Sequence, residues 1–215
     1  MKKLVIAILI VFAAIFVAGC DPYNVEIVTF KDPQFVNMRY AQVMVCVNNN
    51  DLIIKKTFEN EIKFNLQKYG VRSITDSEMF PPTRSYSESE RLQALKHDGY
   101  DAYLVLAIDD YKVDKNNVAP TSQVTTGQVT QNGNNTNYVQ QTQLVGGYTE
   151  TNMNVTYSAK LFDVATNKVA WMGTMKMATD MEYYTNRQIL ASETGKMLIN
   201  RMVTDNVLAA TMPQK

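Results

Sequence analysis

The side chains that most often carry catalytic or metal chemistry are few in this sequence and lie far apart. The chain of 215 residues contains one histidine, His97, and two cysteines, Cys20 and Cys46. We predict that His97 lies in the last turn of a surface helix, where an imidazole interacts favourably with the helix dipole. It has no second His or nearby Cys to complete a metal site. Cys46 lies in the apolar run 43–47, which favours a small buried hydrophobe over a reactive thiol.

Asp109 and Asp110 follow the apolar run 102–108. Two neighbouring carboxylates can form an acid/base pair or a cation site. Adjacent residues of a regular strand point to opposite faces, however, so the polar end of a strand is the favoured interpretation. The sequence contains no GxSxG, Walker A, GxGxxG or HExxH motif, and a Ser-His-Asp triad would depend on His97 alone. We therefore predict no enzyme activity, no cofactor, no metal site and no small-molecule substrate.

Composition and charge restrict the remaining classes of function. The chain carries 21 Lys and Arg against 21 Asp and Glu, with a pI near 6.6, so it has no excess of positive charge with which to bind nucleic acid. A hydrophobic content of 46% is typical of a folded domain and too high for a largely disordered chain. The length suits a single domain.

The first nineteen residues have the features of a secretory signal peptide. Lys2 and Lys3 precede the apolar run 4–17, and the small residues Ala18 and Gly19 stand directly before Cys20. A positive segment, a short apolar core and small residues at the cleavage point define such a signal. The apolar run is shorter than the roughly 18–20 residues that a membrane-spanning helix needs.

The tetrapeptide Val17-Ala18-Gly19-Cys20 resembles the lipobox of bacterial lipoproteins. The resemblance implies that residues 1–19 are removed and that Cys20 is the lipidation site, with several acyl chains holding the protein on a membrane. The mature chain would have 196 residues, with 19 basic and 21 acidic side chains. Asp21 follows the lipid cysteine, and whether the inner or the outer membrane is the destination stays open.

Residues 20–40 are predicted to be a lipid anchor and tether that contributes one short strand, at 25–28. Residues 41–212 are predicted to be a mixed α/β domain. Its first half alternates strands at 43–47, 71–75 and 102–108 with helices at 52–69 and after a capping box at Ser87 and Glu90. Apolar residues recur every fourth position in the first helix, at Ile54, Phe58, Ile62 and Leu66. On the same helix, Glu59 and Lys63 are placed to form an ion pair.

The second half of the domain is predicted to be a β-hairpin and a long helix. Residues 153–161 alternate apolar and polar, and the chain turns at 163–168 into a return strand at 169–173. Trp171 is expected to pack in the core, with an exposed ligand-stacking tryptophan as the alternative. A helix is expected at 185–208, with Gly195 allowing close packing against the sheet, and the tail 209–215 is expected to fray.

This order, β-α-β-α-β-β-β-α, predicts an α/β (α+β) fold of one domain, with helices packed on a mixed sheet. Between its two halves lies a polar insert, residues 116–149, which contains no charged residue. Asn132-Gly133 favours a hairpin near its middle. Val124 and Val129 stand at even and odd positions, so in a strand they would point to opposite faces and make no continuous apolar face. We therefore favour a polar loop or extended hairpin that projects into water or toward a neighbouring subunit. A membrane-inserted hairpin of a shared barrel is the alternative.

Four segments together resemble a family of envelope lipoprotein domains with the TolB amino-terminal-like fold: Gly70-Val71, Gly99-Tyr100-Asp101-Ala102, Lys160-Leu161-Phe162-Asp163-Val164 and Asn167-Lys168-Val169-Ala170-Trp171. The family includes the curli-secretion channel lipoprotein and the lipoprotein activators of penicillin-binding proteins. The resemblance implies no catalytic residues. In the channel member a membrane hairpin lies where this chain has its polar insert.

Together these features predict a lipid-anchored, periplasm-facing protein of the bacterial cell envelope that acts by protein binding or assembly, as an adaptor or scaffold. Its expected partners are the membrane, through the N-terminal lipid, and envelope proteins or further copies of itself. Two alternatives stay open. One is a subunit of an oligomeric secretion channel that inserts the 116–149 hairpin, and the other is an activator of a cell-wall enzyme.

Overall fold

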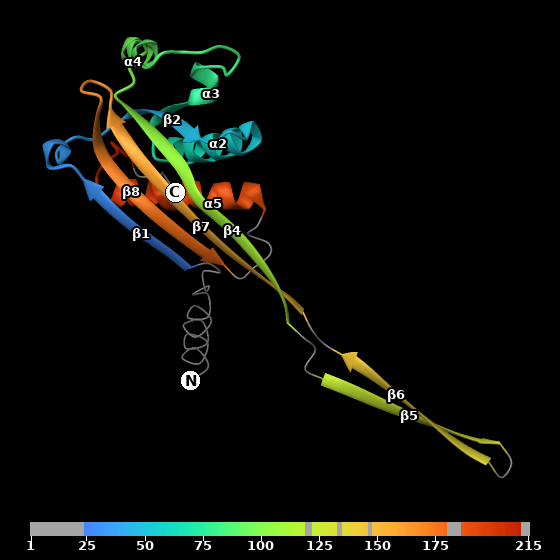
Figure 1. Ribbon diagram of the computed structural model, residues 1–215. Coiled ribbons are helices and arrows are strands. Elements are labelled where there is room, and N and C mark those ends of the chain that lie inside the picture. The colour runs from blue at the N-terminus through green and yellow to red at the C-terminus, as the bar shows by residue number, and fades with distance from the viewer. Residues whose placement is uncertain (1–23, 119–121, 133–134, 146–147, 180–185, 212–215) are drawn as a thin grey trace, which may run out of the picture.

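The computed structural model describes residues 24–118, 122–132, 135–145, 148–179 and 186–211 (Figure 1). The predicted signal peptide and Cys20 lie outside these residues. The first half of the chain forms β1 (Asn24–Lys31), a 3-10 turn η1 (Pro33–Phe35), β2 (Gln42–Asn48), α2 (Leu52–Lys68), β3 (Arg72–Thr75), α3 (Asp76–Met79) and α4 (Glu88–His97). The second half forms β4 (Ala102–Val118), β5 (Ser122–Asn132), β6 (Asn135–Val145), β7 (Tyr148–Asp163), β8 (Lys168–Thr179) and α5 (Arg187–Thr204).

Six of the strands form one mixed sheet in the order β1-β8-β7-β4-β2-β3. Strand β2 pairs in parallel with β3 and with β4, as the helical crossovers between these strands require. Strands β7, β8 and β1 add antiparallel neighbours. The predicted fold class, one mixed α/β domain, is therefore confirmed. Strand β1 lies within the predicted tether and is longer than the strand expected there.

Helices α2 and α5 cover one face of the sheet, on which the larger core lies (Figure 1). Helix α2 begins at Asp51, whose carboxylate accepts hydrogen bonds from the backbone N–H groups of Ile53 and Ile54. It ends before Gly70, which has a φ of 73°. The predicted stripe is confirmed, because Phe58, Ile62 and Leu66 are almost fully buried. Each such side chain stabilises the fold by about 1.5–3 kcal/mol relative to exposure.

Gly195 in α5 allows a close approach to α2, not to the sheet as predicted. A Cβ atom at this position would lie 3.3 Å from the backbone carbonyl of Glu61 and 3.2 Å from Nδ2 of Asn65. Both neighbours belong to α2. The two long helices therefore pack against each other as well as on the sheet.

On the other face of the sheet, α4 packs beside the strands β2 and β4. Leu95 of α4 packs there in a second apolar cluster with Met44, Phe80, Tyr100 and Val164. The capping box of α4 is present as predicted, with Ser87 and Glu90 satisfying each other's backbone N–H groups. The short helix α3 was not predicted. It begins with a second capping box, formed by Thr75 and Glu78.

The prediction that a strand ends at Asp109-Asp110 is wrong. Strand β4 continues to Val118, and its register with β7 shifts between Ile108 and Asp110. This shift is a β-bulge, in which one extra residue is absorbed while the pairing continues beyond it. Two adjacent polar residues therefore mark an irregularity of the strand here, not its end.

The prediction that the tail frays is wrong for the described residues 209–211. The backbone N–H of Ala209 donates to the carbonyl of Tyr40, and that of Thr211 donates to the carbonyl of Tyr69. These bonds fix the chain after α5 to the neighbouring segments. Residues 212–215 lie outside the described part of the chain.

Of the two forms favoured for the polar insert, a loop or an extended hairpin, the structure has the hairpin. Strands β5 and β6 pair antiparallel from Ser122 and Val145 to Asn132 and Asn135, and the turn residues 133–134 lie outside the described residues. Strands β4 and β7 pair as far as Val118 and Tyr148. The β5–β6 hairpin projects from the end of this β4–β7 ladder, away from the helices (Figure 1).

Candidate functional site

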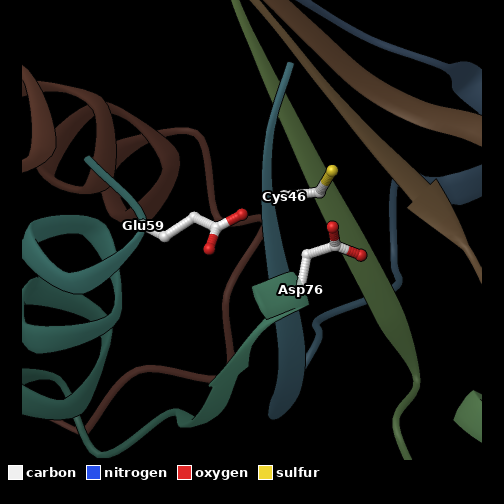
Figure 2. Close-up of side chains that lie close together, drawn as sticks. All are labelled: Cys46, Glu59 and Asp76. Atoms are coloured by element: carbon white, nitrogen blue, oxygen red, sulfur yellow. The ribbon is translucent and has the colours of Figure 1, made fainter. Parts of the chain in front are cut away.

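Three potential metal-ligating side chains meet beside the carboxyl end of β2. The Sγ atom of Cys46 and the carboxylate oxygens of Glu59 and Asp76 all lie within 4.8 Å of one another. Figure 2 shows that Glu59 approaches from α2, on one side of β2, whereas Cys46 and Asp76 lie on the other side. Glu59 and Asp76 are buried and Cys46 is partly buried. Strand β2 positions the thiol, α2 positions Glu59, and the first residue of α3 is Asp76.

Two cationic side chains already neutralise these carboxylates. The Nζ atom of Lys55 lies 2.7 Å from Asp76 Oδ2 and 3.8 Å from Glu59 Oε1. The guanidinium of Arg91 pairs with the other oxygen of Asp76. Glu59 also accepts hydrogen bonds from the backbone N–H groups of Val47 and Ser77, each at 3.3 Å. The ammonium group of Lys55 and the guanidinium of Arg91 thus supply counter-charges to the two buried carboxylates, and we call this arrangement the ion cluster.

Burial controls the protonation of this cluster. Desolvation raises the pKa of Glu59 above its usual value, against the opposing effect of its hydrogen bonds and of Lys55. Burial lowers the pKa of Lys55, but hydrogen bonding and attraction to Asp76 outweigh burial and the net pKa is raised. The pKa of the Cys46 thiol is raised to about 12, mainly by burial and then by the charge of Asp76. The thiol is therefore protonated at neutral pH and is a poor nucleophile.

Cys46 also lines a cavity of about 390 Å³ between α4 and the strands β2 and β4, with Tyr86, Glu88, Arg91 and Tyr103 among the other lining residues. The ring of Tyr103 stacks on that of Phe162 at a centroid distance of 4.7 Å. Its hydroxyl donates to Oδ1 of Asn167. Glu88 and Arg91 also have partners, since Glu88 accepts a hydrogen bond from Asn167 and Arg91 pairs with Asp76.

The chemistry-bearing residues considered from the sequence do not converge on one site. His97 is exposed and pairs with Asp98, its neighbour in the chain. Asp109 accepts a hydrogen bond from Ser158, whereas Asp110 pairs with Lys112. The two adjacent carboxylates therefore have separate partners, and both are exposed.

Trp171 is buried, as predicted, and its Nε1–H donates to Asp205 at 2.9 Å. Cys20, the predicted lipidation site, lies outside the described residues.

The outer part of the β4–β7 ladder, from Lys112 and Asn154 to Val118 and Tyr148, and the β5–β6 hairpin together form a feature that we call the ribbon. The β5–β6 part is a two-stranded sheet, so each of its strands has one outer edge unpaired within the described residues. The base of the ribbon lies in register with the start of β1. Asn24 pairs with Ala178, Ala178 with Asn154 and Asn154 with Lys112. With strands spaced about 4.8 Å apart, Asn24 and Lys112 are separated by about 14 Å across the sheet.

The sheet face opposite α2 and α5 is open at β1 and β8. Val28 and Phe30 of β1 are 63% and 59% exposed, and Met172 of β8 is 42% exposed. Phe30 and Met172 are directly paired across the two strands. Together they make an apolar patch beside an edge strand. Exposed apolar patches and unpaired strand edges are both features of protein interaction surfaces.

No protein-family model matches the chain, and no curated protein matches it. Solved structures with a similar arrangement include the following three. One is the PelC dodecamer from Paraburkholderia phytofirmans, with 12% identity, a TM-score of 0.44 and coverage of 86% of this chain and 99% of that chain. Another is lipoprotein GNA1162 from Neisseria meningitidis, with 12% identity, a TM-score of 0.41 and coverage of 76% and 99%. The third is a minor lipoprotein from Acinetobacter baumannii, with 12% identity, a TM-score of 0.33 and coverage of 78% and 94%.

The ion cluster was not anticipated from the sequence. Glu59 was expected to pair with Lys63, but Glu59 is buried beside Lys55, and Lys63 pairs with Glu78 at 2.7 Å. Lys55, four positions before Glu59, was an equally available partner in the sequence. Only the position of Asp76 in the fold decides between Lys55 and Lys63.

Among the helices that the structure describes, none is both long enough and apolar enough to cross a membrane.

Proposed function

We propose that this protein is a lipid-anchored component of the bacterial cell envelope that acts by binding and assembly, without catalysis. The ribbon is the element that makes the contacts, either with further copies of the chain or with another envelope protein. The lipid on Cys20 holds the domain at a membrane. The ion cluster beside β2 stabilises the domain and takes no part in a reaction.

The observation that carries this proposal is the isolation of the β5–β6 hairpin. An isolated two-stranded hairpin is marginally stable in water, and three or more strands are normally needed for independent stability. Here both outer edges are unpaired within the described residues. Such edges accept strands from other chains. Pairing with a neighbouring ribbon would complete the backbone hydrogen bonds that this hairpin leaves open.

The geometry of the anchor supports the same proposal. Three residues separate Cys20 from Asn24, the first residue of β1, and the four residue-to-residue steps between them span at most about 14 Å. The start of β1 lies in the same register row as Lys112, at the base of the ribbon. The lipid therefore holds the sheet by the end from which the ribbon projects, so the ribbon begins close to the membrane surface.

Sedimentation velocity of the mature chain, residues 20–215 with Cys20→Ala, tests the assembly. We expect an oligomer for this protein and a monomer after residues 122–145 are replaced by a short Gly-Ser linker. A matched variant, Val28→Ser with Phe30→Ser, alters the other exposed surface and should keep the oligomer. Unfolding followed by Trp171 fluorescence checks that each variant is folded. An oligomer that persists without the hairpin would refute the role of the ribbon.

The anchor is tested separately, in cells. Labelled palmitate should enter the protein carrying Cys20 and should be absent from the Cys20→Ala variant. Undiminished labelling of that variant would exclude Cys20 as the lipid attachment point. Crosslinking in the native envelope, followed by identification of the captured proteins, then distinguishes self-association from binding to a different partner.

A second candidate, a subunit of an oligomeric secretion channel, is favoured by the direction of the ribbon. Lys112, Asp114 and Lys115 precede the uncharged segment 116–149, as expected of a strand that passes from water into a membrane. The register opposes this candidate, because a membrane strand needs one apolar face. One alternating set of positions holds Val124, Val139 and Val145, and the other holds Val129, Tyr138 and Leu144. Solubility of the intact, lipid-free chain as a monomer without detergent would exclude the channel.

A further inference from the structure

The edge strand β1 carries apolar side chains on both of its faces. Val25 and Ile27 pack against the core, so the alternation of a strand directs Val28 and Phe30 to the opposite side of the sheet. Both are exposed, and so is Met172 of β8, which is paired directly with Phe30. We call Val28, Phe30 and Met172 the β1–β8 patch.

Apolar exposure is concentrated at this part of the molecule. Nine large apolar side chains are exposed within the described residues, and three of them form the β1–β8 patch. Two more, Val36 and Met38, belong to the segment directly after β1, whereas the other four are spread over α2 and β4. An exposed apolar patch of this kind marks a site that binds a protein or a membrane.

The charged groups beside the patch are matched or positive. Lys160 of β7 is paired directly with Met172, in the same row across the sheet as Phe30. Glu26 of β1 is paired directly with Lys176 of β8. All three charged side chains are exposed, and directly paired residues point to the same side of a sheet. The row that holds Phe30 and Met172 therefore continues into a cation, and the acid of β1 has a lysine opposite it.

The proposed lipid anchor brings one particular surface to this patch. Strand β1 begins at Asn24, at most about 14 Å from Cys20. Phe30 lies six residues further along β1, which is about 20 Å at 3.3 Å per residue. The lipid cysteine is therefore within about 34 Å of Phe30 along any path of the linking residues. A short tether gives a second contact a high effective concentration, so even a weak contact with the same membrane forms.

The size of the patch favours a lipid surface over a protein. A stable protein interface contains roughly 20–30 residues on each side, far more than the three apolar side chains of the β1–β8 patch. A lipid-linked protein needs only a small second signal, since a single weak anchor becomes stable when one more apolar or basic contact is added.

We propose that the β1–β8 patch contacts the phospholipid membrane that holds the Cys20 lipid. Val28, Phe30 and Met172 enter the boundary between headgroups and acyl chains, and Lys160 pairs with anionic headgroups. The inference rests on the proposed anchor at Cys20. It adds an orientation, in which the face of the sheet opposite α2 and α5 is turned toward the membrane at β1 and β8.

A tethered chain with a fluorescent reporter tests this contact. Residues 20–215 are coupled through the Cys20 thiol to vesicles of phosphatidylcholine and phosphatidylglycerol that contain a maleimide lipid, while the partly buried Cys46 reacts slowly. Phe30→Trp places a fluorophore in the patch, and Ile53→Trp, at an exposed apolar position of α2, is the matched control. Brominated acyl chains should quench the added emission of Phe30→Trp and leave that of Ile53→Trp unchanged.

Flotation of the untethered Cys20→Ala chain with the same vesicles measures the contribution of each group. Val28→Ser with Phe30→Ser should lower the partition coefficient about tenfold, as expected for two apolar side chains that stay in water. Lys160→Gln should lower it about fivefold on vesicles with phosphatidylglycerol and leave it unchanged on phosphatidylcholine alone. Lys56→Gln, an exposed position on α2, is the control and should bind as the parent chain does.

Two results would overturn the proposal. One is equal quenching, or none, in Phe30→Trp and Ile53→Trp, which would leave the patch to a protein partner. The other is vesicle binding that persists in Val28→Ser with Phe30→Ser but is lost when residues 122–145 are replaced by the Gly-Ser linker, which would assign the membrane contact to the hairpin. Neither result changes palmitate labelling of Cys20, so failure of this contact is distinguishable from failure of the anchor.

Discussion

The Nζ atom of Lys55 lies 2.7 Å from Oδ2 of Asp76. Lys55 is on the first turn of α2, and Asp76 is the first residue of α3. The same ammonium group lies 3.8 Å from Oε1 of Glu59. This contact thus joins two helices beside β2 and supplies a counter-charge to two buried carboxylates.

Substitution Lys55→Met should destabilise the fold by about 2–4 kcal/mol, because it removes a charged partner from carboxylates that stay buried. Urea unfolding monitored by Trp171 fluorescence measures the change. Lys63→Met is the control, since Lys63 pairs with the half-exposed Glu78 and such pairs contribute about 0–1 kcal/mol. Equal losses in the two variants would show that Asp76 and Glu59 do not depend on Lys55.

The raised pKa of Glu59 makes a prediction about pH. Because the folded state holds the proton of Glu59 more tightly than the unfolded chain does, this group costs stability as the pH rises from about 4.5 through its raised pKa. In Glu59→Gln the cost is absent. The free energy of unfolding of the variant minus that of the parent chain should therefore increase over this pH range and then level off. The range from about pH 4 to 8 covers the ordinary pKa of a glutamate and higher values. If the difference in free energy of unfolding between the variant and the parent chain did not change over this range, the pKa of Glu59 would not be raised.

Cys46 should react slowly with thiol reagents in the folded protein. Burial raises the pKa of this thiol from an ordinary 9.0 to about 12, so the thiolate at pH 8 is about a thousandfold scarcer than in the unfolded chain. In the Cys20→Ala protein, Cys46 is the remaining cysteine. Its rate of reaction with an aromatic disulfide, measured with and without denaturing urea, gives the ratio directly. A folded-state rate within tenfold of the unfolded rate would contradict the burial of this thiol.

Helices and strands of the domain were predictable where a regular spacing of apolar residues was bounded by residues that typically begin or end such an element. In α2, the Phe58 stripe lies between the Asp51 cap and Gly70, and the helix forms between them. In β7, Met153, Val155 and Tyr157 alternate with polar residues, and their side chains are buried. Neither signal needs knowledge of a partner segment, since each is set by the local backbone and by one buried face.

Features that depend on two distant segments were not predictable. The continuation of β4 past Asp109 is decided by its pairing with β7, about fifty residues later, where the bulge accommodates the extra residue. The partner of Glu59 is decided by Asp76, which lies on α3 and pairs with Lys55.

Gly195→Ala should destabilise the protein by about 1 kcal/mol, although the same change in an exposed helix stabilises by about that amount. The new Cβ would lie 3.3 Å from the backbone of Glu61 and 3.2 Å from Nδ2 of Asn65, and a helix backbone cannot move away as a flexible side chain can. Ser192→Ala on the same helix is the control and should stabilise by a few tenths of a kcal/mol. Thermal unfolding measures both. An increase in stability for Gly195→Ala would mean that α5 can shift on α2 without loss, and hence that the contact between the two helices is looser than these distances require.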